Sequence, residues 1–251
     1  MFEPFFHINY LAFTKKISPG KRGWETKKEV YSNVYCINEG VNVGHAYQTI
    51  DFETWKRKEY CQIYRSAVQP QYCVSFELDV TNFKKYVKEN KLSFTMAFIF
   101  AVTKCSNEIE EFRYRFLDGE VVLYESIDTS FTYMDKETEL FKVVDVPMQD
   151  TIEKFVQLAI VTAENQKEHF TGPVENDVYQ FSALPWITFT HISHTDFGNR
   201  EKAQPIFDWG KYHEREGKFM MPFAVQVHHA FVDGIHIGKL ADKLQRYLDE
   251  V

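Results

Sequence analysis

Two adjacent histidines near the end of the chain are the residues best suited to chemistry. His228 and His229 lie in the run QVHHAFVDG, and Asp233 follows His229 by four residues. A free histidine has a pKa of about 6.5, so its neutral imidazole can act as a general base at neutral pH. The carboxylate of Asp233, next to Gly234, can cap a helix or pair with an arginine. The run therefore contains a base and a group to hold it, although two structural histidines would also give an HH pair.

The flanking elements predict how this base is held. Residues 219–231 (FMMPFAVQVHHAF) have the strongest strand pattern of the chain, and an amphipathic helix pattern follows to Glu250. Strand side chains alternate between two faces, so His228 and His229 should meet different surroundings. One face carries Phe223, Val225, Val227 and His229, and the other carries Ala224, Gln226 and His228. The buried side of the helix carries Ile237, Leu240, Leu244 and Leu248.

The remaining patterns predict a mixed α and β architecture. Helices are expected at 51–65, from Thr81, at 92–109 and at 149–169. Strands are expected at 71–80, 178–183 and 186–192, and hairpins around Asp118-Gly119 and from Asp135 to Glu139. This order favours an α/β (α+β) two-layer sandwich with a mixed β-sheet, as one domain over residues 46–251. Residues 1–45 have no clear period and are expected to be an N-terminal extension, with order and disorder both open.

Composition and charge exclude several classes of protein. The 251 residues are 44% hydrophobic and 16% aromatic, which supports a sizeable core. The net charge of −7 argues against nucleic acid as a partner. We find no apolar run long enough to cross a membrane and no basic leader typical of a signal peptide. The four cysteines form no CxxC pair, which predicts a reducing cytoplasm and no zinc ribbon. They are Cys36, Cys61, Cys73 and Cys105.

Several runs carry a family resemblance. HHAFVDG resembles the HHxxxDG signature of the chloramphenicol acetyltransferase family, and SALPWITFT (182–190) resembles its SxxPW segment. DFETWKRKEYCQIYR resembles the family's WxRxExFxxY segment, with Cys61 in place of Phe, and the stretch from FDWGK to DKLQ resembles its C-terminal block. The resemblance covers roughly residues 47–250. Condensation domains share HHxxxDG but need two such halves. Dihydrolipoamide acyltransferases share HxxxDG but carry a lipoyl domain, which we do not find here.

The resemblance implies a reaction and roles for four residues. The family transfers an acetyl group from acetyl-CoA, a co-substrate, to a hydroxyl of chloramphenicol, and uses no bound cofactor. It is homotrimeric, with active sites at subunit interfaces. His229 resembles the catalytic base, and Ser182 resembles the hydroxyl that stabilises the oxyanion. Asp233 resembles a structural carboxylate that pairs with Arg57 and holds the loop of the base.

The resemblance also implies substrate contacts, although each of these residues could instead belong to the ordinary core or surface. Acceptor contacts are expected at Tyr64, Phe141, Val143, Ile192, His194 and Asp208. CoA contacts are expected at Trp186, Lys211 and Tyr212. His194 stands where the better-known members have an apolar residue, and Asp208 stands where they have Thr. These departures indicate either a pocket for a different acceptor or an interaction between His194 and Asp208.

Other functions fit the sequence less well. The first alternative is an O-acetyltransferase of the same fold acting on a different hydroxylated small molecule. The second is a non-catalytic trimeric ligand-binding protein, which would have no chemical need for the four catalytic and supporting residues. His191 and His194 are weak evidence for a metal, and we expect none. Ser182, His229 and Asp233 could suggest a hydrolase triad, but no GxSxG elbow is present.

Overall fold

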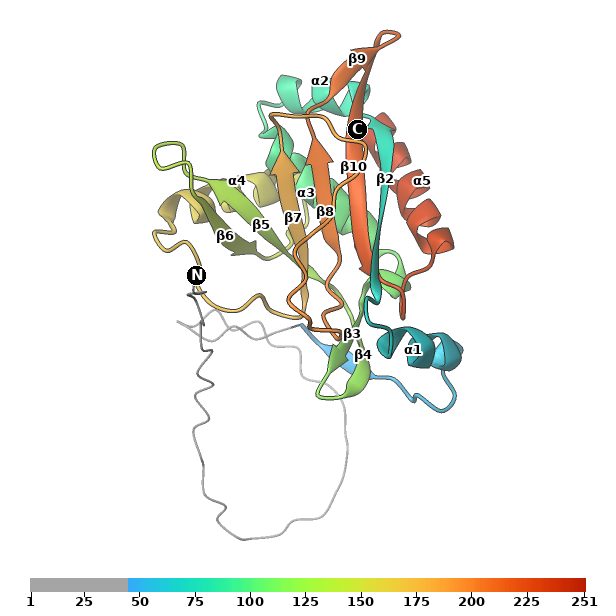
Figure 1. The fold of residues 1–251 in the computed structure, drawn as a ribbon. Helices are drawn as coiled ribbons and strands as arrows, with labels where there is room; N and C mark the ends of the chain where they lie inside the picture. The colour runs from blue at the N-terminus through green and yellow to red at the C-terminus, as the bar shows by residue number, and fades with distance from the viewer. Residues whose placement is uncertain (1–44) are drawn as a thin grey trace, which may run out of the picture. The chain divides into compact units, whose positions relative to one another are not determined.

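A seven-stranded mixed sheet forms the centre of the computed structural model, which describes residues 45–251 (Figure 1). The strand order is β2-β10-β8-β7-β5-β6, and β9 pairs with β10. β7 runs parallel to both β5 and β8, and the other pairs are antiparallel. The strands are β2 (Gln71–Asp79), β5 (Asp128–Met134), β6 (Phe141–Val146), β7 (Val178–Leu184), β8 (Ile206–Gly210), β9 (His213–Arg215) and β10 (Lys218–His228).

A smaller antiparallel sheet and five helices complete the described part of the chain. The small sheet has the order β1-β4-β3, with β1 (Tyr47–Thr49), β3 (Tyr114–Leu117) and β4 (Glu120–Tyr124). The helices are α1 (Lys58–Arg65), α2 (Thr81–Glu89), α3 (Phe94–Asn107), α4 (Ile152–Asn165) and α5 (Gly234–Glu250), with a 3-10 turn at Glu110–Phe112. The predicted mixed α+β fold is confirmed, as are the two hairpins, β3–β4 and β5–β6. Asp118 and Gly119 both have positive φ at the first of them.

The core lies between the large sheet and the helix layer. α3 is mostly apolar and mostly buried, as its sequence predicts, with Lys104 exposed in its last turn. Its Phe98 ring lies 5.1 Å from Trp209 of β8 and 5.7 Å from Phe223 of β10, between ring centroids. α5 packs beside α3, and its Leu240 and Leu244 are fully buried. This face of β10 is the apolar face that the alternation predicts.

The opposite face of the large sheet is polar, and the segment between β7 and β8 crosses it (Figure 1). Two rows of register partners run across this face. The first row is Gln180, Ile206 and Gln226, and the second is Ser182, Asp208 and Ala224. Partners in neighbouring strands point to the same side of a sheet. Ser182 of β7 and Asp208 of β8 therefore lie on the face that the helices leave uncovered.

The helix predicted over 51–65 is wrong in its first half. Residues 51–57 form turns, and α1 begins only at Lys58. The Asp51 carboxylate accepts hydrogen bonds from the amide of Glu53 and the hydroxyl of Thr54, which favours a turn over a helix. Trp55 then packs on Tyr114 of the small sheet, with ring centroids 5.0 Å apart.

Two further local predictions are wrong. Residues 186–192 form no strand: β7 ends in a turn at residues 185 and 186, and no sheet pairing follows it there. Thr81 does not cap α2, since the cap residue is Val80 and Thr81 is the first helical residue. The Asp79 carboxylate instead accepts hydrogen bonds from both the amide and the hydroxyl of Thr81.

Some sequence predictions lie outside residues 45–251. The extension predicted over residues 1–45 lies there except for His45, as does Cys36. The other three cysteines are free, with Cys61 and Cys105 buried and Cys73 half-buried. No helix within residues 45–251 is long and apolar enough to span a bilayer.

Candidate active site

His229 lies just beyond the end of β10, in a socket made by two tyrosines. Its ring stacks on Tyr64 of α1, with centroids 3.9 Å apart and planes 9° from parallel. Tyr72 of β2 packs against it at 4.6 Å. The His229 amide donates to the carbonyl of Pro70 at 2.9 Å, which anchors the turn to the start of β2. The side chain is still 32% exposed, so the imidazole is held rigidly yet can be reached.

His228 lies in different surroundings from His229, as the strand alternation predicts. It is buried, and its Nε2 donates to the carbonyl of Arg200 at 2.8 Å. Its Nδ1 accepts from the amide of Ala230 at 3.1 Å. Burial lowers the pKa of His228 to about 4, so the ring stays neutral and can accept that bond. The two neighbouring histidines thus differ in their surroundings: His228 is buried and hydrogen-bonded to the backbone, and His229 is stacked and partly exposed.

An ion pair ties α1 to the turn that holds His229. Arg57 donates from Nη1 to Asp233 Oδ2 at 2.7 Å and from Nη2 to Oδ1 at 3.1 Å, in the two-pronged geometry that arginine favours. Arg57 Nε also donates to the carbonyl of Ala230 at 3.3 Å. Hydrogen bonding to Arg57 lowers the pKa of Asp233. His229 Nδ1 lies 3.2 Å from Asp233 Oδ1, but these two atoms are not oriented for a hydrogen bond.

Three supporting residues escaped the sequence analysis. The Tyr72 hydroxyl donates to the carbonyl of Val232 at 3.1 Å while its ring contacts His229. His236 is buried in α5, and its Nδ1 accepts from the amide of Asp233 at 2.9 Å. Its Nε2 lies 3.4 Å from the Glu111 carboxylate. His236 lies in the run that follows Asp233, but nothing in the sequence pairs Tyr72 or Glu111 with this turn.

His194 and Asp208 form a hydrogen-bonded pair on the polar face of the sheet. Asp208 is fully buried, and its Oδ2 lies 2.8 Å from His194 Nε2. Its other oxygen, Oδ1, is buried without a hydrogen-bond partner. Burial raises the pKa of Asp208, and the contact with His194 opposes that rise. The interaction was one of two alternatives in the sequence analysis. Ser182 is half-buried and is the register partner of Asp208.

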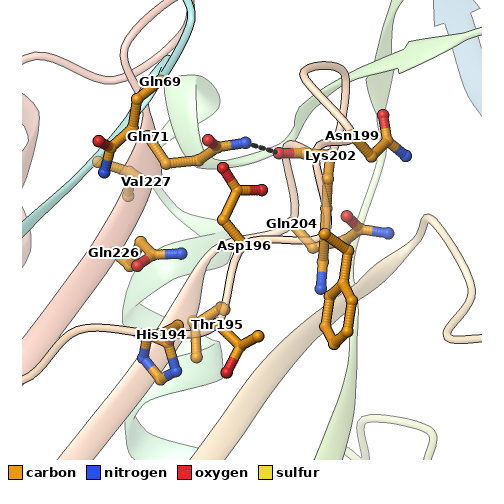
Figure 2. Close-up of a pocket in the computed structure, with 12 residues that line it drawn as sticks. Gln69, Gln71, His194, Thr195, Asp196, Asn199, Lys202, Gln204, Gln226 and Val227 are labelled. Carbon is orange, nitrogen blue, oxygen red and sulfur yellow. Dashed lines mark hydrogen bonds between the residues drawn. The ribbon is translucent and has the colours of Figure 1, made fainter. Parts of the chain in front are cut away.

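A pocket of about 60 Å³ lies where the segment 194–204 crosses β10 and β2 (Figure 2). Its walls include His194, Asp196, Lys202 and Gln226. The Gln71 side chain donates to the carbonyl of Lys202 at 2.9 Å and closes one side. Polar groups dominate these walls, and His194 connects them to the Asp208 side chain. Ile192, expected to contact the acceptor, is not among the residues that line this pocket.

The structure separates the two principal catalytic candidates within one chain. Ser182 on β7 is the register partner of Asp208 on β8, which in turn pairs with Ala224 on β10. His229 follows Ala224 by five residues along the chain. Standard strand dimensions put the two Cα atoms roughly 19 Å apart. Tyr64 lies with His229, whereas Phe141 and Val143 lie on β6, at the far edge of the sheet.

The residues expected to contact CoA lie near one another. The Lys211 amide donates to the carbonyl of Ile187 at 2.7 Å, which brings the segment after Trp186 next to the segment that contains Tyr212. Gly210 allows this approach, because a Cβ there would lie 2.8 Å from the Ile187 oxygen. Trp186 is 61% exposed, and Lys211 is also exposed.

Comparison with known proteins decides the family. The family model for chloramphenicol acetyltransferase matches residues 45–245. The chain belongs to the chloramphenicol acetyltransferase family. A chloramphenicol acetyltransferase of Klebsiella sp. is 35% identical over 208 residues, which cover 81% of this chain and 94% of the relative. One from Proteus mirabilis is 30% identical over 204 residues, covering 80% and 94%.

Solved structures agree with this membership. A chloramphenicol acetyltransferase structure matches with a TM-score of 0.75 at 30% identity, over 81% of this chain and all of the other. A probable dihydrolipoamide acetyltransferase from Listeria monocytogenes shares the fold, with a TM-score of 0.56 at 15% identity over 76% of this chain and 89% of the other. This member of the chloramphenicol acetyltransferase family is therefore an acyltransferase.

Proposed function

We propose that this enzyme transfers the acetyl group of acetyl-CoA to a hydroxyl of chloramphenicol. The observation that carries the proposal is the placement of His229, stacked on Tyr64 and backed by the Arg57–Asp233 pair in a chain of this family. A base needs a fixed ring and an open approach, and this side chain has both.

The chemistry proceeds by direct attack. Nδ1 of His229 faces Asp233, so Nε2 takes the proton of the acceptor hydroxyl. The acceptor oxygen then attacks the thioester carbonyl, whose oxygen becomes an oxyanion that accepts a hydrogen bond from Ser182. The C–S bond breaks when this intermediate collapses, and the departing CoA sulfur takes the proton from His229. The enzyme returns to its starting state without a covalent acyl group.

A second copy of the chain completes the site. A reacting acetyl group can span only a few ångströms, and it cannot touch His229 and Ser182 of one chain when their Cα atoms are roughly 19 Å apart. His229 of one protomer therefore works with Ser182 of its neighbour. A homotrimer closes such head-to-tail contacts into a ring and yields three equal sites.

The remaining residues expected to contact the acceptor or CoA have the following places in this trimer. Tyr64 borders the acceptor beside His229, while Ile192, His194, Asp208, Phe141 and Val143 belong to acceptor walls away from that socket. Trp186, Lys211 and Tyr212 bind CoA, with the Lys211 ammonium toward a phosphate. We place the reaction in the cytoplasm, since Cys61, Cys73 and Cys105 are free thiols.

Release of free CoA thiol tests this function. Purified enzyme is mixed with acetyl-CoA and a thiol-reactive dye, with and without chloramphenicol. Release that depends on chloramphenicol supports the proposal. No release, with acetyl-CoA binding shown by calorimetry, points to a different hydroxyl acceptor. Failure to bind acetyl-CoA overturns the enzymatic assignment in favour of ligand binding alone.

A different acceptor is the second candidate, and one observation favours it. The buried His194–Asp208 pair puts a polar wall beside the pocket of Figure 2. Ligand pockets are commonly lined by apolar and aromatic side chains, which suit an aryl group. The hydroxyl groups of an acceptor would find hydrogen-bond partners along this polar wall, and a panel of small alcohols in the same assay distinguishes the two.

A further inference from the structure

A buried carboxyl beside Ser182 poses an electrostatic problem for acetyl transfer. Asp208 has no exposed surface, and it is the register partner of Ser182 on the neighbouring parallel strand. Partners in adjacent strands are about 4.8 Å apart and point to the same face. A negative charge on Asp208 would therefore lie within several ångströms of the oxyanion that Ser182 is proposed to stabilise. Like charges at such a distance oppose each other strongly, because little water screens them.

Among the described residues, His194 is the one titratable side chain in hydrogen-bond contact with Asp208. Its Nε2 lies 2.8 Å from Asp208 Oδ2, and Asp208 Oδ1 has no partner. The other ionisable groups nearby are the Cys73 thiol on β2 and the Asp196 and Lys202 side chains of the pocket. None of these three is hydrogen-bonded to Asp208, so the charge of the carboxyl depends on His194.

We infer that His194 is a positioning residue that keeps the His194–Asp208 pair electrically neutral during acetyl transfer. The pair keeps one proton beyond that of a neutral imidazole beside a carboxylate, either as imidazolium with carboxylate or as imidazole with carboxylic acid. Both forms have no net charge. Loss of that proton would leave a carboxylate facing the oxyanion. This inference rests on the proposed function, because it concerns the charge beside Ser182 in that reaction. Burial raises the pKa of Asp208, which agrees with a site that disfavours the bare carboxylate.

Substitution of His194 by glutamine tests the inference. Glutamine can still donate a hydrogen bond to Asp208, but it cannot carry the proton. We expect kcat of His194→Gln to fall on the order of 100-fold at pH 8, with a smaller loss at pH 6, because burial raises the pKa of Asp208 and a lower pH favours its neutral form. The double variant His194→Gln/Asp208→Asn removes the charge and should recover at least tenfold of that loss at pH 8.

Matched variants separate this effect from misfolding and from failure of the proposed reaction. His191→Gln changes an exposed histidine of the same loop and should keep the wild-type kcat and pH profile. A wild-type melting temperature for His194→Gln shows that the fold is intact. An unchanged kcat in that variant from pH 6 to 9, or a double variant no faster than the single one, overturns the inference. The inference also predicts that wild-type kcat declines at alkaline pH, as the pair gives up its extra proton, and that Asp208→Asn abolishes this decline. If His194→Gln fails to fold, a wild type without an alkaline decline, or an Asp208→Asn variant that keeps it, overturns the inference.

The His229→Ala variant distinguishes failure of the proposed reaction from failure of the inference about His194. If His229→Ala retains the wild-type rate, the proposed reaction itself is wrong. If His229→Ala is inactive while His194→Gln is unaffected, only the role of the His194–Asp208 pair is wrong.

Discussion

At the scale of single residues, two neighbouring histidines differ because of what surrounds them. His229 lies between tyrosine rings with part of its edge exposed, and His228 is enclosed by backbone groups. Strand alternation separates their faces, so the difference follows from backbone geometry. Each histidine leads to a different experiment.

His229→Ala should lower kcat by about 10³-fold or more, because the acceptor loses its base. The melting temperature should stay close to wild type, since the ring is partly exposed and forms no hydrogen bond with any residue of 45–251. Steady-state thiol release and differential scanning fluorimetry measure the two quantities. A variant that turns over at a rate close to wild type would contradict the proposed base.

His228→Gln should alter the pH dependence of stability. The pKa of His228 is about 4 in the fold and about 6.5 when unfolded, so the unfolded chain binds the proton first as pH falls. The contribution of His228 to the free energy of unfolding is fully present above pH 6.5. It falls by about 3 kcal/mol in all as the pH drops from 6.5 to 4. Urea unfolding at pH 7.5 and pH 4.5 should show the stability gap between wild type and variant shrinking at the lower pH. A gap that is the same at both values would contradict this titration.

At the scale of elements, the Arg57–Asp233 pair joins segments from opposite ends of the described chain. Arg57 precedes α1, and Asp233 is the N-cap residue of α5. The bond to Ala230 also fixes the backbone between His229 and α5. The socket of His229 therefore depends on where both helices begin.

Arg57→Ala should cost about 3 kcal/mol of stability and also lower the rate, because it leaves the partly buried Asp233 without its partner. The matched control is Lys154→Ala, which breaks the exposed pair with Asp150 and should cost less than about 1 kcal/mol. Urea unfolding and kcat measure both variants. An unchanged free energy of unfolding for Arg57→Ala would argue against the ion pair.

Gly210→Ala should weaken acetyl-CoA binding. The new Cβ would lie 2.8 Å from the Ile187 oxygen, so the segment that carries Trp186 has to move. We expect KM for acetyl-CoA to rise about tenfold, with a smaller change for the acceptor. Gly172→Ala has no heavy atom near its added Cβ and should leave both values unchanged. Equal KM values in Gly210→Ala and wild type would argue against CoA binding at this segment.

The elements also show where sequence patterns stop being sufficient. Periodicity places β10, α3, α4 and α5 within a few residues of their observed bounds, because burial follows the repeat of the backbone. It overextends α1, because the Asp51 carboxylate makes a local turn that periodicity does not register. Periodicity also predicts a strand at 186–192 that the structure lacks, because a local pattern carries no information about which strands pair in the sheet.

At the scale of the whole molecule, the large sheet separates residues that the proposed reaction brings together. His229 lies beyond the end of β10, and Ser182 lies two strands away on the polar face. In the proposed reaction, a contact between two copies of the chain joins them. This separation leads to a prediction that holds only if the active site is shared between two chains.

Two inactive variants should restore activity in mixed assemblies. His229→Ala supplies an intact Ser182, and Ser182→Ala supplies an intact His229. Co-expression at equal levels should regain roughly a quarter of wild-type sites if the two residues come from neighbouring copies. Thiol release measures the activity, and light scattering should give three times the mass of one chain. Mixtures as inactive as each parent would contradict a shared site.

The sequence by itself determined the family motif, the mixed architecture and the identity of the candidate base. Those features depend on local order along the chain: an alternating strand, a tight turn and an amphipathic helix. The tertiary structure decided which side chains surround the base, that His194 contacts Asp208, and that Ser182 and His229 are far apart in one chain. Strand order and register set these relations, and residues distant in sequence meet only when the sheet is assembled.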